Sequence, residues 1–360
     1  MSQNVISQPV EAQQSFARAV TESLPGLLLV CAVALVASFV APKLEAYPLF
    51  KTYLSLKDFI LAIIFGIIIR NTVGVPAVFQ PGLRYSTIMT KTGIVIMGSS
   101  YSLAGLVSVG AQALVFIAVF LFGTALVMMW LCRKVGMSTP LAACLAAGMS
   151  VCGVSATIAI APAVKAKNED MAYSIAVVLM FGLLALIAFP LIGKVFNLTP
   201  EQFGAFAGVG IVNSAQVLAA GFGFSQEAGI VAGIYNIGRV VFLPFVVLML
   251  AIMAAAQEAE QGNEVAKINK WQMIRDKFPL FVLGFLAIVC LNTAGVLTKP
   301  EVKMAKHFME WAFLLGFASI GLTTRLSDLR AAGLNGFLFG FGVAGLKAAL
   351  ALAAVLLFMS

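Results

Sequence analysis

The chain has 360 residues, of which 61% are hydrophobic and 11% charged, and its formal net charge is +8. Soluble domains carry about 25% charged residues, so this composition excludes a globular domain dissolved in water and predicts a membrane protein. The basic residues lie mainly in short connections such as CRKVG, where they contact lipid headgroups. We therefore expect the lipid bilayer as a partner and no nucleic acid.

Apolar runs recur along the whole chain, and about 20 apolar residues are enough for a helix to cross a bilayer. Because the runs are continuous rather than alternating, we predict helices and not a closed barrel. The predicted fold class is an all-α polytopic membrane protein with about 10–11 transmembrane helices, located as a multi-pass protein in the cell inner membrane. The predicted helix cores are 24–41, 58–73, 86–107, 111–132, 139–165, 170–195, 203–222, 226–256, 279–297, 307–326 and 335–359.

Four regions follow from this pattern. Residues 1–23 form a polar N-terminal segment, and residues 24–256 carry transmembrane helices that include a core of broken helices. Residues 257–277 form a hydrophilic connection of mixed charge, which we expect at the membrane surface. Residues 278–360 carry the C-terminal transmembrane helices, and a homo-oligomer is an open alternative to a single copy.

An internal repeat relates the two ends of the chain. The segment KTGIVIMGSSYSLAGLVSVG (91–110) aligns without gaps to LLGFASIGLTTRLSDLRAAG (314–333), so the C-terminal region is a repeat of 84–132. With eleven helices, the two copies are the third and the tenth and cross the membrane in opposite senses. Inverted repeats of this kind are typical of secondary transporters.

A first polar cluster interrupts the apolar run at MSVCGVSATIAIAPAVKAKNED (149–170). Glycine is tolerated where a helix unwinds, and Ser or Thr re-satisfies the freed backbone groups. A half-helix that starts near Gly153 presents free N–H groups and a positive dipole end, which suit an anion. The alternative is that the small residues only allow close helix packing. The candidate substrate-binding residues here are Cys152, Gly153, Val154, Ser155 and Thr157.

A second polar cluster lies in GVGIVNSAQVLAAGFGF (208–224), where Asn213, Ser214 and Gln216 interrupt an apolar element. Each amide costs free energy in lipid unless it is paired. The three residues are candidates for substrate binding, and the side-chain oxygens of Asn213 and Gln216 are candidates for a sodium ion. The alternative is a hydrogen bond between helices. We expect no other cofactor.

Arg239 lies well inside a predicted span, in YNIGRVVFLPFV. An arginine at this depth is costly and marks a transport pathway or a buried pair. Guanidinium binds oxyanions in a bidentate manner, so an anionic substrate is a candidate partner. The alternatives are pairing with Glu227 or extension of the side chain to the membrane surface.

Cys152 is also a candidate nucleophile, which would make the protein a membrane enzyme. The sequence places no histidine or acid to activate this thiol, so we expect that the protein is not an enzyme. Acidic residues fall near the ends of the predicted helices, which disfavours a carboxylate-based proton pump.

The first cluster resembles the signature of the YeiH-type sulfate exporter family of bacterial inner-membrane proteins. The matching residues are Cys152, Gly153, Ser155, Ala156, Ala161, Pro162, Lys165, Ala166, Lys167 and Glu169. The chain departs from this family at Val212, where the family has a histidine, and at Asn236, where it has a lysine. The order of elements is also similar to bile acid–sodium symporters, which implies a panel domain and a core domain with broken helices at the midplane.

Together these observations predict a secondary active transporter of a small anion: sulfate, a sulfonate or a carboxylate. The resemblance adds Asn236 to the candidate substrate-binding residues, and the loss of two cationic positions favours a less highly charged anion. Motion of the core against the panel would give alternating access. A passive anion channel is the alternative.

Overall fold

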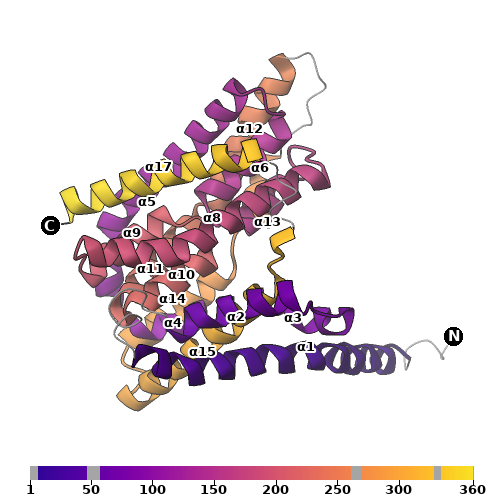
Figure 1. Ribbon diagram of the computed structural model, residues 1–360, viewed down its shortest axis with the longest axis vertical. Helices are drawn as coiled ribbons and strands as arrows, with labels where there is room; N and C mark the ends of the chain where they lie inside the picture. The colour runs from indigo at the N-terminus through magenta and orange to yellow at the C-terminus, as the bar shows by residue number, and fades with distance from the viewer. Residues whose placement is uncertain (1–6, 47–56, 261–268, 328–333, 360) are drawn as a thin grey trace. The chain divides into compact units, whose positions relative to one another are not determined.

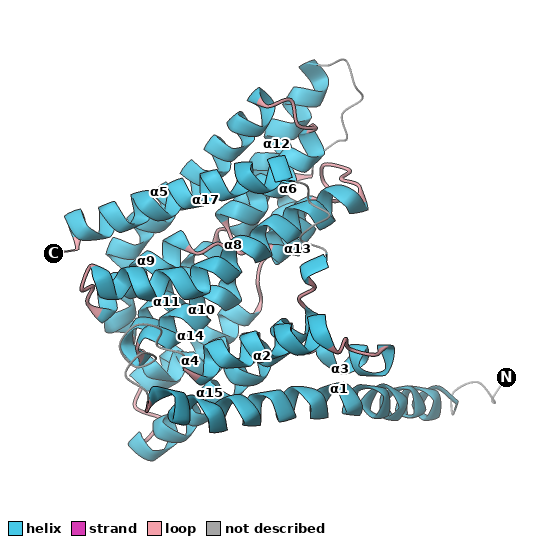
Figure 2. Ribbon diagram, in the orientation of Figure 1, coloured by secondary structure: helices cyan, strands magenta, loops and turns pink. Residues whose placement is uncertain are grey.

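The computed structural model describes residues 7–46, 57–260, 269–327 and 334–359. Within these ranges every regular element is a helix (Figure 2), which confirms the predicted all-α membrane protein. Five of the helical segments are long and apolar enough to cross a bilayer by themselves. They are Thr21–Leu44, Ala113–Lys134, Asn168–Val195, Leu243–Glu260 and Phe339–Phe358.

The chain divides into two compact units. The first unit contains α1 (Ser7–Glu45), α2 (Asp58–Thr72), η2 (Ala77–Phe79), α3 (Gln80–Leu83), most of α4 (Ser86–Met97) and the part of α15 (Lys299–Thr323) that starts at Phe308. Its helices approach closely at glycines, since a Cβ on Gly66 of α2 would lie 2.8 Å from the carbonyl carbon of Gly321 in α15. Such contacts between small residues are how membrane helices pack.

The second unit contains the remaining described helices, whose order along the chain can be followed by colour in Figure 1. They are η3 (Gly98–Ser100), α5 (Leu103–Lys134), α6 (Thr139–Ser150), α7 (Val154–Ile160), α8 (Asn168–Val195), α9 (Pro200–Gly210), α10 (Ser214–Phe224), α11 (Gln226–Val241), α12 (Leu243–Glu260), α13 (Lys270–Lys277), α14 (Phe281–Thr293) and α17 (Leu334–Phe358).

Two predicted boundaries fall elsewhere in the structure. The helices expected at 86–107 and 111–132 meet instead at η3, and α5 is continuous through 107–111. In lipid the backbone must satisfy its own hydrogen bonds, so the glycine at 110 stays helical. The helix predicted at 226–256 is divided at Phe242 into α11 and α12. Pro244 has no N–H group and so cannot continue the hydrogen bonds of the α-helix.

The ends of the chain regions also differ from expectation. Helix α1 begins at Ser7 and so extends into the predicted polar segment 1–23, and α13 occupies part of the predicted connection 257–277. The aligned repeats share one feature: η3 ends at Ser100 and α15 ends at Thr323, which are equivalent positions. Residues 328–333 of the second copy lie outside the described residues, so the inverted relation stays a prediction.

Candidate functional site

The first interrupted helix is formed by α6 and α7. Helix α6 ends at Ser150, the chain turns through 151–153, and α7 begins at Val154. Gly153 makes this turn possible with φ +76° and ψ −116°, a conformation that residues with a Cβ rarely adopt. Its N–H donates to the carbonyl of Gly148 at 3.1 Å. The break predicted inside 139–165 is therefore confirmed.

The second interrupted helix is formed by α9 and α10. Helix α9 ends at Gly210, and the chain bends through 211–213, where Ile211 and Asn213 have extended backbone angles, before α10 begins at Ser214. The N–H of Ala215 donates to Asn213 Oδ1 at 3.0 Å, so Asn213 caps the start of α10. The polar cluster predicted in 208–224 thus marks a helix interruption as well.

The two interruptions are in contact with each other. A Cβ on Gly153 would lie 3.2 Å from Asn213 Nδ2 and 3.3 Å from Asn213 Cα. Helices α7 and α10 therefore begin at one place, which we call the crossing and define by residues 151–153 and 211–213. The first N–H groups of a helix lack partners inside that helix and form its positive end. The crossing thus brings two such ends together.

Helix α11 packs against α9 and α10 (Figure 1). Hydrogen bonds place two of its residues, Asn236 and Arg239, at the crossing. Arg239 is only 1% exposed. Its Nη1 donates to the carbonyl of Ile211 at 2.7 Å, and its Nη2 donates to Asn236 Oδ1 at 3.4 Å. In the described chain these are its partners, rather than Glu227, which was the alternative left open by the sequence.

Lys347 of α17 is a second buried cation, and the sequence analysis missed it. The side chain is 4% exposed, and its Nζ donates to the carbonyl of Met149 at 3.0 Å. Met149 lies in the last turn of α6, directly before the first interruption. A single lysine inside the apolar run 335–359 was the available signal, because a charge within a membrane span is costly.

Thr157, a predicted binding residue, has its hydroxyl bonded to the protein. The Oγ1 lies 3.1 Å from Ser174 Oγ of α8, and it lies 3.3 Å from the carbonyls of Cys144 and Gly153. This buried hydroxyl ties α7 to α6 and α8. We therefore interpret Thr157 as a residue that holds the first interruption in shape.

The other predicted residues of the first cluster lie on different faces. Cys152 is buried, Val154 is half-buried, and Ser155 is exposed at the start of α7. Gln216 contacts α8, where its Nε2 donates to the carbonyl of Leu179 at 3.3 Å. Gly182 of α8 makes room for this amide.

Several buried polar atoms have no hydrogen-bond partner within the part of the chain that the structure describes. Near the crossing they are Ser214 Oγ, Asn236 Nδ2 and Arg239 Nε, and beside α8 there is Gln216 Oε1. The first three can all donate a hydrogen bond. A buried donor without a partner costs free energy, so these atoms indicate a ligand that accepts hydrogen bonds.

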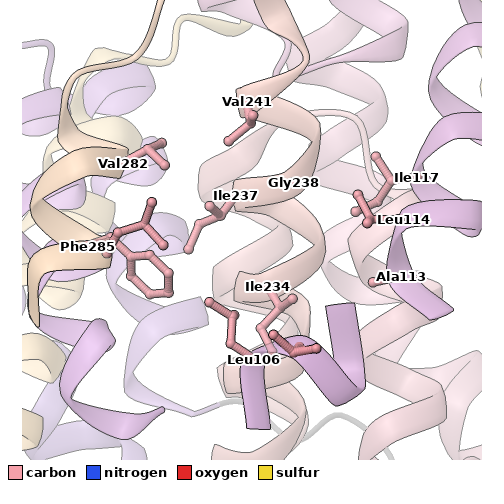
Figure 3. Close-up of a pocket in the computed structure, with 12 residues that line it drawn as sticks. Leu106, Ala113, Leu114, Ile117, Ile234, Ile237, Gly238, Val241, Val282 and Phe285 are labelled. Carbon is pink, nitrogen blue, oxygen red and sulfur yellow. The ribbon is translucent and has the colours of Figure 1, made fainter. Parts of the chain in front are cut away.

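An apolar pocket of about 390 Å³ lies on the opposite face of α11 (Figure 3). Ile234, Ile237, Gly238 and Val241 line it at spacings of three and four residues, so they share one side of the helix. Side chains from α5 and α14 close it. Asn236 and Arg239 do not line this pocket, and the polar crossing is therefore a separate feature.

The fold and the crossing define a multi-pass α-helical membrane protein in which two interrupted helices meet. A family model described as Conserved hypothetical protein 698 matches residues 25–340, and the chain belongs to this family. This confirms the family membership that the motif beginning at Cys152 indicates.

Curated relatives carry the name UPF0324 membrane protein. The relative from Nitratidesulfovibrio vulgaris is 34% identical over 317 residues, which cover 85% of each chain. The relative from Corynebacterium glutamicum is 30% identical over 363 residues and 99% of each chain, and that from Agrobacterium fabrum is 28% identical over 316 residues and 86% of each. No solved structure matches the chain, so the likeness to bile acid–sodium symporters stays a prediction.

Proposed function

We propose that this protein is a secondary active transporter that moves a small anion across the bacterial inner membrane. The candidate anions are sulfate, a sulfonate and a carboxylate. The proposal rests on one observation: the unpartnered donors of Ser214, Asn236 and Arg239 lie around a crossing where two helices begin. Helix N-termini and buried donors both favour a negative ligand.

The arrangement also suits a carrier more than a fixed pore. Carriers bind substrate where discontinuous helices meet and alternate access by moving one body against another. Two observations support the proposal: α6–α7 and α9–α10 are interrupted, and the chain divides into two compact units.

The test is uptake into proteoliposomes that contain the purified full-length protein. Labelled sulfate, isethionate and malonate are offered separately, with the rate measured against concentration. A carrier gives saturable uptake and exchange of internal for external anion. Uptake that rises linearly with concentration and shows no exchange would instead establish the passive channel, and no uptake of any of the three anions counts against an anion carrier.

The role of Asn236 in binding the anion is tested by the variant N236A, with N292A as its control. N236A removes Nδ2, which has no partner in the described chain, and also Oδ1, which accepts from Arg239 Nη2 at 3.4 Å, so the variant should melt at a lower temperature than the wild type. Losing a hydrogen bond to a charged ligand costs about 1.5–3 kcal/mol, so KM should rise by about tenfold or more.

Asn292 of α14 is the control, because its Nδ2 donates to the carbonyl of Tyr101 at 2.8 Å away from the crossing. N292A should lower the melting temperature and leave KM unchanged. If N236A transports with the KM of the wild type, Asn236 does not bind the anion.

A further inference from the structure

The carbonyl ends of interrupted helices attract cations. The C-terminal end of a helix carries a partial negative charge, and carriers with discontinuous helices use these ends and the unwound carbonyls to hold a coupling ion such as sodium. Two such ends, those of α6 and α9, lie directly before the two stretches that form the crossing.

At the end of α6 three carbonyl groups have partners. The carbonyls of Ala147 and Gly148 accept the N–H groups of Val151 and Gly153. The carbonyl of Met149 accepts from the Lys347 ammonium at 3.0 Å. A side-chain cation therefore lies where the negative end of α6 is directed.

The end of α9 is arranged in the same way. The carbonyl of Ala207 accepts the N–H of Ile211, and the carbonyl of Ile211 accepts from the Arg239 guanidinium at 2.7 Å. Each interruption thus has one buried cation bound to a backbone carbonyl, and the two cations come from different helices, α17 and α11.

The partners of both cations are neutral. Lys347 contacts the Met149 carbonyl, and Arg239 contacts a carbonyl and the amide of Asn236, with no carboxylate bound to either within the described ranges. A buried charge without a counter-ion is costly, and the negative ends of α6 and α9 are the groups beside Lys347 and Arg239 that can offset this cost.

The oxygens considered for sodium in the second cluster have other surroundings. Asn213 Oδ1 accepts the N–H of Ala215 as a helix cap. Gln216 Oε1 lies against Gly182 of α8. Asn213 Oδ1 is therefore engaged, and Gln216 Oε1 is a single oxygen without a partner in the described chain rather than a ring of ligands.

We propose that Lys347 and Arg239 take the places of coupling cations at the two interruptions, so that the protein transports its anion without sodium. This inference rests on the proposed function. In this proposal Lys347 is a positioning residue, because its ammonium occupies the place at the carbonyl end of α6 where a free cation would otherwise bind.

The test compares melting temperatures of the purified protein in sodium chloride and in choline chloride at equal ionic strength. The wild type should melt at the same temperature in both salts. K347A leaves the Met149 carbonyl without its cation and leaves space beside it, so sodium should now raise the melting temperature by several degrees. K347R keeps a charge at this position and should show no sodium effect, as in the wild type.

Two outcomes of this comparison overturn the inference. The first is sodium-specific stabilisation of the wild type, which would mean that the protein has a sodium site in addition to the buried cations Lys347 and Arg239. The second is a K347A variant that folds and is indifferent to sodium, which would mean that Lys347 does not fill an ion position.

A second measurement uses the wild type alone and therefore does not depend on whether K347A folds. Uptake of the anion identified in proteoliposomes is compared with sodium and with choline on both sides of the membrane. Equal rates support the inference, and a loss of tenfold or more without sodium overturns it. Failure to transport any anion would count against the proposed function, whereas the melting comparison needs no substrate and still decides the role of Lys347.

Discussion

Substitution of Gly153 by alanine perturbs the crossing most sharply. The residue has φ +76°, where an alanine is strained, and the new Cβ would lie 2.8 Å from Val178 Cγ1 and 3.2 Å from Asn213 Nδ2. Backbone strain of this kind costs about 1–3 kcal/mol, and overpacking of a well-packed site adds about 1–3 kcal/mol. The sum is at least about 2 kcal/mol.

Gly136 provides the matched control, since it also has φ +76° but nothing lies within 4 Å of an added Cβ. G136A therefore carries the backbone strain without the contact at the crossing. We expect G153A to lower the melting temperature by several degrees more than G136A, and to impair anion uptake while G136A does not.

The assay is thermal unfolding of the detergent-purified variants, followed by saturable uptake in proteoliposomes. Equal melting temperatures and equal uptake for G153A and G136A would refute the claim that the two interruptions are packed against each other.

The remaining predictions concern the supports of the crossing. T157V removes a hydroxyl that lies 3.1 Å from Ser174 Oγ, and leaving that buried partner unpaired should lower the free energy of unfolding by about 1–3 kcal/mol. T157S keeps the hydroxyl and should melt like the wild type. A T157V variant with an unchanged melting temperature would contradict this role. G182A places a Cβ 1.6 Å from Gln216 Oε1, so it should destabilise the protein where G123A, with nothing within 4 Å, does not. The double variant G182A/Q216A should recover the loss, and no recovery would show that Gln216 is not what Gly182 accommodates.

The sequence predicted the interrupted helices because their chemistry is local. Gly153 and the adjacent hydroxyl residues stand out in an apolar run, and Asn213 stands out as a polar residue in the second run. That Asn213 caps the start of α10 is seen only in the structure. The membrane class follows equally directly from the length of the apolar runs. These features need no knowledge of tertiary contacts.

The partners of the crossing could not be predicted in this way, because they depend on which helices pack together. Lys347 lies 194 residues after Gly153 in the sequence, and only the packing of α17 on α8 and α9 brings its ammonium to Met149. Arg239 was singled out correctly as a buried charge, but its carbonyl partner Ile211 was not foreseen. The role of Thr157 could not be predicted for the same reason, because its hydroxyl is hydrogen-bonded to Ser174 on α8, a partner that only the packing of the helices shows.

The most direct test of the central claim is a structure of the protein with its transported anion bound. The account predicts density for the anion at the crossing, within hydrogen-bonding distance of Asn236 Nδ2 and Arg239 Nε. An anion bound elsewhere in the molecule, with residues 151–153 and 211–213 packed as they are here and no density beside them, would contradict it.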